Sequence, residues 1–251
     1  GSAVAPSPVF VGAYDTGVSF VAFGGSTNET DVPTVDATTT NNGRSSLKVI
    51  VAAAGSYSGG ALVAAAPRNL TAYNALTFWA KADKAVSTNN FGFGNNNSPA
   101  TGMITESHGP AGVGTPLTTA WTKYTIPLPN PAKATAVTGL FYFSDGTKGY
   151  TLWLNDIQFE ALGATDFAAC CGATTSTSAA LPAGPKSVTL GSPVSIGNSA
   201  PNTLFRAQTT ATTYQVGWGW YDFASSAPGV ATVDADGNIQ PHAVGTTDLT
   251  A

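Results

Sequence analysis

Short runs of strand-forming residues, separated by clusters of glycine, asparagine, proline and serine, recur along most of this chain. Clear examples are residues 46–52, 75–82, 121–127, 137–144 and 150–159. No segment shows a sustained apolar repeat of 3.6 residues with helix caps, and the most helix-like stretch is a single turn near residues 69–74. The pattern predicts an all-β protein made of antiparallel strands, arranged as a sandwich or a barrel.

The composition excludes several functional classes. Charged residues make up 10% of the 251 residues, and the net charge is −4. Without a basic patch, we expect no nucleic-acid partner. The longest apolar run, residues 49–54, is strand-sized, so we expect no membrane insertion. Hydrophobic residues at 43% and aromatic residues at 10% predict a packed core rather than a disordered chain.

The residue content changes at residues 163–185, which are rich in small residues, threonine and serine. We interpret this stretch as a linker between a domain at residues 3–162 and a smaller one at residues 186–251. The chain begins with Gly-Ser and ends in a strand-like sequence. We therefore expect a monomeric piece of a longer secreted or cell-surface protein, linked there to further domains.

Three strands of the N-terminal part place an aromatic residue opposite their apolar face. Alternation puts Trp79, Tyr142 and Trp153 on the side away from the core. Exposed rings can stack on the C–H faces of sugars, while amides, carboxylates and hydroxyls bind the sugar hydroxyls. The alternative is that these rings form half-buried sheet surface or lie under loops. The nearby polar candidates are Asn95, Asn96, Asn97, Glu106 and His108.

Four segments in order carry a resemblance to a known family: GRSSLKV (43–49), RNLTAYNALTFWAKA (68–82), WTKYTIPL (121–128) and YTLWLNDIQF (150–159). Over residues 9–160 the chain resembles the β-jelly-roll carbohydrate-binding modules of secreted polysaccharide-degrading enzymes. The resemblance implies a β-sandwich jelly roll that binds a polysaccharide. Related jelly rolls also serve as docking or structural modules.

Such modules often hold a structural calcium ion, and the resemblance places Asp15 and Asp156 as its ligands. This sequence has Asn155 where many relatives have aspartate, and it lacks their paired acids at the first strand. The alternative is that Asp15 caps a turn and Asp156 is an ordinary acid at the end of a strand.

Residues 186–251 resemble a bacterial Ig-like domain of the second group. The resemblance rests on SVTLGSP (187–193), FASSAPGVATVDADGNI (223–239) and VGTTDLT (244–250). It implies a second, smaller β-sandwich, with a hairpin turn at residues 234–238 rather than a calcium loop. Trp218 and Trp220 depart from the family pattern, and we interpret them as interface or core residues, with a second sugar-stacking platform as the alternative.

Catalysis finds little support in the sequence. The two histidines fall in different predicted domains, and no nucleophile-elbow, P-loop or dinucleotide motif is present. A glycosidase needs two carboxylates facing each other, and Glu106 with Asp145 is the one pair worth checking. The adjacent Cys170 and Cys171 leave a vicinal disulfide, free thiols and intermolecular bonds open.

The sequence therefore predicts a non-catalytic module that binds a neutral polysaccharide, either β-glucan-like or hemicellulose. The alternative is a structural or adhesive surface module without a glycan site. The predicted ligand-binding residues are Tyr57, Trp79, Asn95, Glu106, His108, Tyr142 and Trp153.

Overall fold

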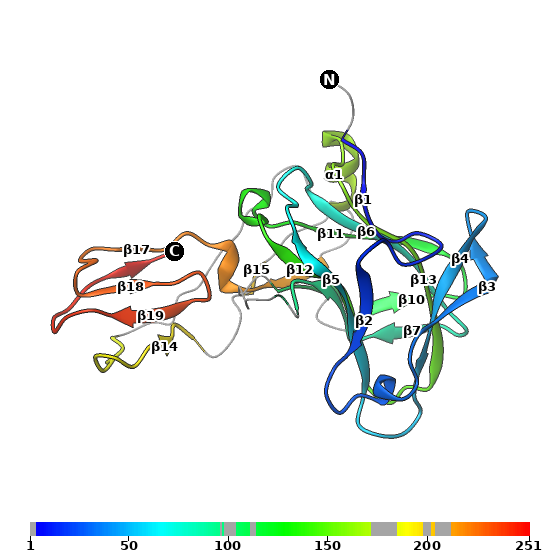
Figure 1. The fold of residues 1–251 in the computed structure, drawn as a ribbon, viewed down its shortest axis with the longest axis horizontal. Helices are drawn as coiled ribbons and strands as arrows, with labels where there is room; N and C mark the ends of the chain where they lie inside the picture. The colour runs from blue at the N-terminus through cyan, green and yellow to red at the C-terminus, as the bar shows by residue number, and fades with distance from the viewer. Residues whose placement is uncertain are drawn as a thin grey trace.

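A computed structural model describes residues 4–95, 97, 104–110, 114–171, 185–197, 202–203 and 212–251 of the chain. Within them, side chains are described except those of residues 107–110, 202–203 and 212–213. Antiparallel strands form two large sheets that pack face to face, and a smaller unit made of the C-terminal strands projects to one side (Figure 1).

The first large sheet has six strands and is called here the six-stranded sheet. Its strand order is β11-β6-β13-β4-β3, and β1 also pairs with β13. The strands are β1 (Ser7–Phe10), β3 (Thr34–Asn41), β4 (Arg44–Val51), β6 (Ala75–Ala82), β11 (Thr122–Pro127) and β13 (Tyr150–Glu160).

The second large sheet has seven strands in the order β15-β16-β9-β8-β12-β5-β2 and is called the seven-stranded sheet. Its strands are β2 (Val18–Ala22), β5 (Ser58–Arg68), β8 (Asn90–Phe93), β9 (Thr105–Pro110), β12 (Val137–Asp145), β15 (Asn202–Thr203) and β16 (Thr212–Val216). A short ribbon, β7 (Val86–Thr88) with β10 (Thr115–Leu117), accompanies them.

The main core lies between the two large sheets because each central strand turns its apolar alternate residues inward. Phe78 of β6 shows this packing: its ring centroid lies 5.0 Å from that of Phe91, 5.1 Å from Phe141 and 5.4 Å from Tyr124. Edge-on and offset ring pairs of this kind add to the energy of area burial. The predicted all-β jelly-roll sandwich is confirmed.

The C-terminal unit has a separate small core. Ile196, Trp218, Ala231 and Ile239 form its buried cluster. Two small sheets, β14-β19-β18 and β17-β20, enclose it. Their strands are β14 (Val194–Ser195), β17 (Ala224–Ser225), β18 (Ala231–Val233), β19 (Asn238–Pro241) and β20 (Leu249–Thr250).

The predicted hairpin turn of this unit is present between β18 and β19. The Asp234 carboxylate accepts hydrogen bonds from the backbone N–H groups of Asp236 and Asn238, each at 2.9 Å. Gly237 has a φ of +77°, which suits glycine. The Asp234 carboxylate therefore organises a turn.

The structure divides the C-terminal part differently from the sequence-based boundary at residue 186. β15 and β16 lie within the predicted Ig-like stretch, yet they extend the seven-stranded sheet by pairing with β9. Tyr214, Val216 and Trp220 belong to the main core. The 3-10 helix η3 (Trp218–Trp220) places its two tryptophans in the two different cores, in agreement with the interface or core interpretation.

Helical structure is sparse in the described residues. Apart from η3, there are two other 3-10 turns, η1 (Thr27–Glu29) and η2 (Pro131–Lys133), and one α-helix, α1 (Ala164–Cys171). The composition predicts a linker over residues 163–185, but the alanine-rich segment 164–171 within it folds as a helix that ends in a disulfide between Cys170 and Cys171. None of the described helices is long and apolar enough to cross a membrane.

Candidate functional site

The predicted ligand-binding residues divide between the two large sheets. Trp79 and Trp153 lie on the outer face of the six-stranded sheet, whereas Tyr142 and Glu106 belong to the seven-stranded sheet. Alternation correctly gives the side of each strand on which a residue lies. It does not give the sheet to which the strand belongs, and so the three aromatic residues do not form one platform.

Trp153 is engaged with its own sheet surface. Its indole N–H donates to the Asp36 carboxylate at 2.9 Å, and the Lys81 ammonium lies 5.5 Å from its ring centroid. The pKa of Asp36 is held far below its ordinary value, first by the Thr38 hydroxyl and backbone N–H and then by Trp153. Trp121 likewise donates to the carbonyl oxygen of Thr40, at 2.9 Å. Residues 36–40 thus accept a hydrogen bond from each of these two indole rings.

Charged groups on the same face pair with one another. Lys123 and Glu160 form an ion pair at 3.4 Å, and the Gln158 amide donates to Glu160. Trp79 stands in register between Lys123 and Asn155 and is half-buried. These contacts match the alternative reading of Trp79 and Trp153 as half-buried sheet surface.

The outer face of the seven-stranded sheet is built on small residues. In register across it lie Glu106, Gly92, Tyr142, Ala61 and Val21. A Cβ on Gly92 would come within 2.6 Å of the Tyr142 ring, so this ring lies directly on the sheet surface. The glycine is therefore required for the ring to lie flat.

Tyr142 is buried rather than exposed, with 1% of its surface accessible. Its hydroxyl donates to the Glu106 carboxylate. Burial, followed by the Glu106 charge, raises the pKa of Tyr142 well above its ordinary value. The prediction that Tyr142 stacks directly on a sugar is therefore corrected: the ring is inaccessible, and its hydroxyl orients Glu106.

Phe23 is a half-exposed ring of this face that is not among the residues predicted from the sequence. Its ring centroid is 6.0 Å from that of Tyr142. A Cβ on Gly59 would come within 3.2 Å of Phe23, so Phe23 covers that glycine. The available signal was alternation, since Ser19, Val21 and Phe23 share the outward side of a strand whose Val18 and Phe20 face the core.

Tyr57 lies at the rim beside Phe23. Its hydroxyl donates to the carbonyl oxygen of Gly24 at 2.8 Å, and its ring is half-buried. Phe23, Tyr57, Tyr142 and Glu106 therefore form one connected group, called here the aromatic face.

The remaining polar candidates have different places. Asn97 accepts hydrogen bonds from the backbone N–H groups of Thr138 and Gly139, at 3.1 and 2.8 Å, and so holds the start of β12. Asn95 is half-buried in the turn after β8. His108 lies in β9, with its side chain outside the described part, and Asn96 is outside the described residues.

The proposed calcium ligands each face an arginine. Asp15 pairs with Arg68 at 2.7 Å, and Asp156 receives two hydrogen bonds from Arg44, at 2.9 and 2.8 Å. Among the described residues, no three His, Cys, Asp or Glu side chains gather as metal ligands. The donors present do not fit a calcium ion, because guanidinium groups already neutralise both carboxylates.

The carboxylate pair of a hydrolase does not form either. Asp145 is buried on the core side of β12, where Tyr150, Lys148 and the backbone N–H groups of Asn89 and Gly146 satisfy it. Glu106 lies on the opposite side of the same sheet. Two carboxylates on opposite faces of a sheet cannot flank one glycosidic bond.

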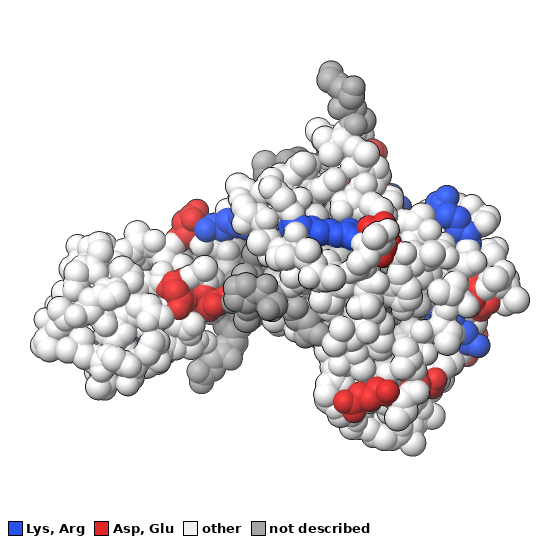
Figure 2. All heavy atoms as spheres, viewed as in Figure 1, with Lys and Arg blue, Asp and Glu red and all other residues white. Residues whose placement is uncertain are grey.

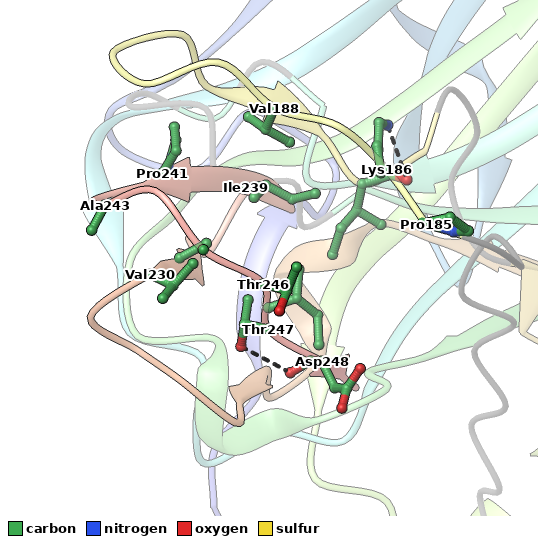
Figure 3. Close-up of a pocket in the computed structure, with 14 residues that line it drawn as sticks. Pro185, Lys186, Val188, Val230, Ile239, Pro241, Ala243, Thr246, Thr247 and Asp248 are labelled. Atoms are coloured by element: carbon green, nitrogen blue, oxygen red, sulfur yellow. Dashed lines mark hydrogen bonds between the residues drawn. The ribbon is translucent and has the colours of Figure 1, made fainter.

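A cavity of about 610 Å³, lined by both apolar and polar residues, lies within the C-terminal unit (Figure 3). Its lining includes Val188, Ile196, Ile239 and Leu249, together with Lys186 and Asp248. The Lys186 ammonium is bound to the carbonyl oxygen of Ser195. The one cationic group that lines the cavity among the described residues is thus already bound to the backbone.

Comparisons with known proteins identify the N-terminal part. The model of a family described as carbohydrate binding domain 30 matches residues 12–161. The fold is similar to a family 30 carbohydrate-binding module of a cellulosomal cellulase of Clostridium thermocellum, with 20% identity and a TM-score of 0.48 over 63% of this chain and 98% of that one.

Two other solved structures show weaker similarity. A family 11 carbohydrate-binding module of a Clostridium thermocellum cellulase is 10% identical, with a TM-score of 0.45 over 64% of this chain and 97% of that one. A beta-1,2-glucanase from Parabacteroides distasonis is 11% identical, with a TM-score of 0.40 over 98% of this chain and 38% of that one. No curated protein matches the chain.

Proposed function

The chain belongs to the carbohydrate binding domain 30 family, a family of non-catalytic carbohydrate-binding modules, and on that premise we propose that it binds a neutral polysaccharide on its aromatic face. A β-glucan or a hemicellulose is the expected ligand. The proposal includes a secreted or cell-surface location, as a monomeric module of a larger protein.

One observation carries the choice of face. On the seven-stranded sheet, the half-exposed Phe23 ring packs near the Tyr142 ring, and the Tyr142 hydroxyl holds the Glu106 carboxylate in place on the same face. An apolar ring and an oriented acceptor on one face suit a sugar, which presents a C–H face and a rim of hydroxyl donors.

The charge of the face supports a neutral ligand. Among the described outer-face positions in register with Glu106, there is no lysine or arginine to pair with an acidic polymer. The view in Figure 2 likewise shows no broad patch of a single sign. An unpaired anionic sugar would lose hydration without a compensating charge.

Affinity electrophoresis in gels containing β-glucans, xylans, mannans, xyloglucan or pectins tests the proposal. We expect one neutral class to retard the protein. Phe23→Ala should weaken binding about tenfold, because it removes the exposed ring. Trp79→Ala, a half-buried aromatic residue on the six-stranded sheet, is the matched control and should retain affinity.

The outcomes separate the alternatives. Loss of affinity in Trp79→Ala alone would move the site to the six-stranded sheet. No retardation of a protein that melts cooperatively would favour a structural or adhesive module. Each gel is also run with EDTA. Weaker retardation in EDTA would show that a divalent cation such as calcium supports binding.

A further inference from the structure

β16 joins the seven-stranded sheet, although it lies outside the segment that the family model matches. The family match covers residues 12–161, whereas β16 spans Thr212–Val216. It pairs with β9, placing Gln215 opposite Glu106. Just beyond the strand, the Gly217 N–H donates to the carbonyl oxygen of Ile104 at 2.7 Å. The sheet that carries the aromatic face is thus one hairpin wider than the family domain.

The side chain of Gln215 belongs to the outer face of this sheet. Its neighbours Tyr214 and Val216 are 3% and 0% exposed and belong to the main core. Side chains alternate along a strand, so Gln215 lies on the opposite side, and it is half-exposed. The register then forms one row across six strands: Gln215, Glu106, Gly92, Tyr142, Ala61 and Val21. Gly92, Tyr142 and Ala61 in this row are buried, whereas Gln215 and Glu106 are half-exposed neighbours.

We propose that Gln215 is a glycan-contacting residue that extends the aromatic face beyond the family domain; this inference rests on the proposed function. Strands lie about 4.8 Å apart, so β16 adds one step of about 4.8 Å to this face beyond Glu106. One step is comparable to the length of one sugar unit along a chain. Gln215 therefore adds contact for about one further sugar unit.

The chemistry of the pair Gln215 and Glu106 suits the rim of a sugar ring. Directly opposite residues on one face have Cβ atoms about 5 Å apart. A carboxylate only accepts hydrogen bonds, whereas a glutamine amide both donates and accepts. Together the two groups match neighbouring hydroxyls, each of which can donate and accept.

The position of Gln215 is fixed by the core beneath it. The Tyr214 hydroxyl donates to the carbonyl oxygen of Thr125 in β11, at 3.0 Å, which ties β16 to the opposite sheet. After Gly217, Trp220 is 3% exposed and packs edge-on against Phe93, with 6.0 Å between centroids. A contact residue on such a rigid support loses little entropy when the ligand binds.

The test compares two isosteric variants of the full chain. Gln215→Met removes the amide at nearly constant length, and Gln158→Met does the same for a half-buried glutamine on the six-stranded sheet. Affinities for cello-oligosaccharides and xylo-oligosaccharides of two to six units are measured by calorimetry, and the fold is checked by melting. We expect Gln215→Met to bind the longest ligand about three- to tenfold more weakly, and Gln158→Met to match the parent.

The length series gives the sharper criterion. In Gln215→Met, the affinity gained from the final sugar unit should disappear, while shorter ligands that do not reach β16 should keep their affinity. The inference would be overturned if the affinities of Gln215→Met paralleled those of the parent at every ligand length. If Phe23→Ala still lost affinity in that case, the proposed function would remain intact. If Gln215→Met melts at a lower temperature, Gln215→Asn provides the second variant, which keeps the amide but shortens its reach and should show the same selective loss. If the parent binds neither series and no neutral polysaccharide retards it in the gels, the proposed function fails, and the inference fails with it.

Discussion

Asp156 adopts a backbone conformation that few non-glycine residues tolerate, with a φ of +47°. It lies where the register of β13 shifts between Asn155 and Gln158. Aspartate is among the residues that enter this region most easily. Its nearly buried carboxylate is paired in bidentate fashion with Arg44. The register shift in β13 is therefore stabilised by Arg44.

Replacing this cation should cost more than replacing a cation on the surface. We expect Arg44→Met to lower the free energy of unfolding by about 2 kcal/mol, because it leaves a nearly buried carboxylate without its partner. Lys123→Met is the matched control, since Lys123 is 42% exposed against 46% for Arg44, but its partner Glu160 is more accessible. That control should change stability by less than about 0.5 kcal/mol.

Urea denaturation with and without EDTA measures the free energy of unfolding of the parent and of both variants. The two variants should differ at every condition, and chelation should leave the parent unchanged. Equal destabilisation by Arg44→Met and Lys123→Met would contradict the account. A clear loss of parent stability in EDTA would show that the carboxylates bind a cation after all.

At the level of elements, η3 connects two cores through tryptophans one glycine apart. Trp220 packs in the main core, and Trp218 packs in the core of the C-terminal unit against Phe223, with 5.9 Å between ring centroids. Lys133 of η2 also forms an ion pair with Asp222, at 2.6 Å. The connection between the two units is thus built from the chain around residues 218–222.

The two tryptophans should therefore have separable effects. Trp220→Ala should destabilise the sandwich by about 3–5 kcal/mol, since it leaves a cavity in the main core. Trp218→Ala should mainly loosen the C-terminal unit. Hydrogen exchange distinguishes them: Trp220→Ala should speed exchange in β12, and Trp218→Ala in β18 and β19. Identical exchange patterns in both variants would mean that the two cores unfold as one.

Strand positions and facing could be predicted from the sequence, but pairing between distant strands could not. Leu76, Phe78 and Ala80 face the core as their alternation indicates. β16 joining β9 depends on a contact between residues about a hundred positions apart, and no local pattern encodes it. The same limit explains why Tyr142 was grouped with Trp79, and why Phe23, which follows the end of β2, was missed.

Considered as a whole, the molecule buries tyrosine hydroxyls in several parts of the sandwich. Burial is the first cause that raises the pKa of Tyr142, Tyr150 and Tyr214 above the ordinary value. Negative charge on Glu106 adds to it at Tyr142, and Asp145 does so at Tyr150. All three hydroxyls therefore stay protonated in the folded protein at a pH where an unfolded chain would release these protons.

The sign of the pH dependence follows from this difference. Below about pH 10, both states hold the tyrosine protons, and the stability is fully present. As the pH rises through 10, only the unfolded state loses protons, so the free energy of unfolding falls by up to about 1.4 kcal/mol per pH unit for each such tyrosine. Tyr214→Phe removes one of these groups, so its slope between pH 10 and 11.5 should be shallower than that of the parent. At pH 8 the variant should be about 1 kcal/mol less stable, because the hydrogen bond to Thr125 is lost. Denaturant titrations at half-unit pH steps should thus show two curves that converge as the pH rises, and parallel curves would rule out a role for Tyr214 in alkaline unfolding.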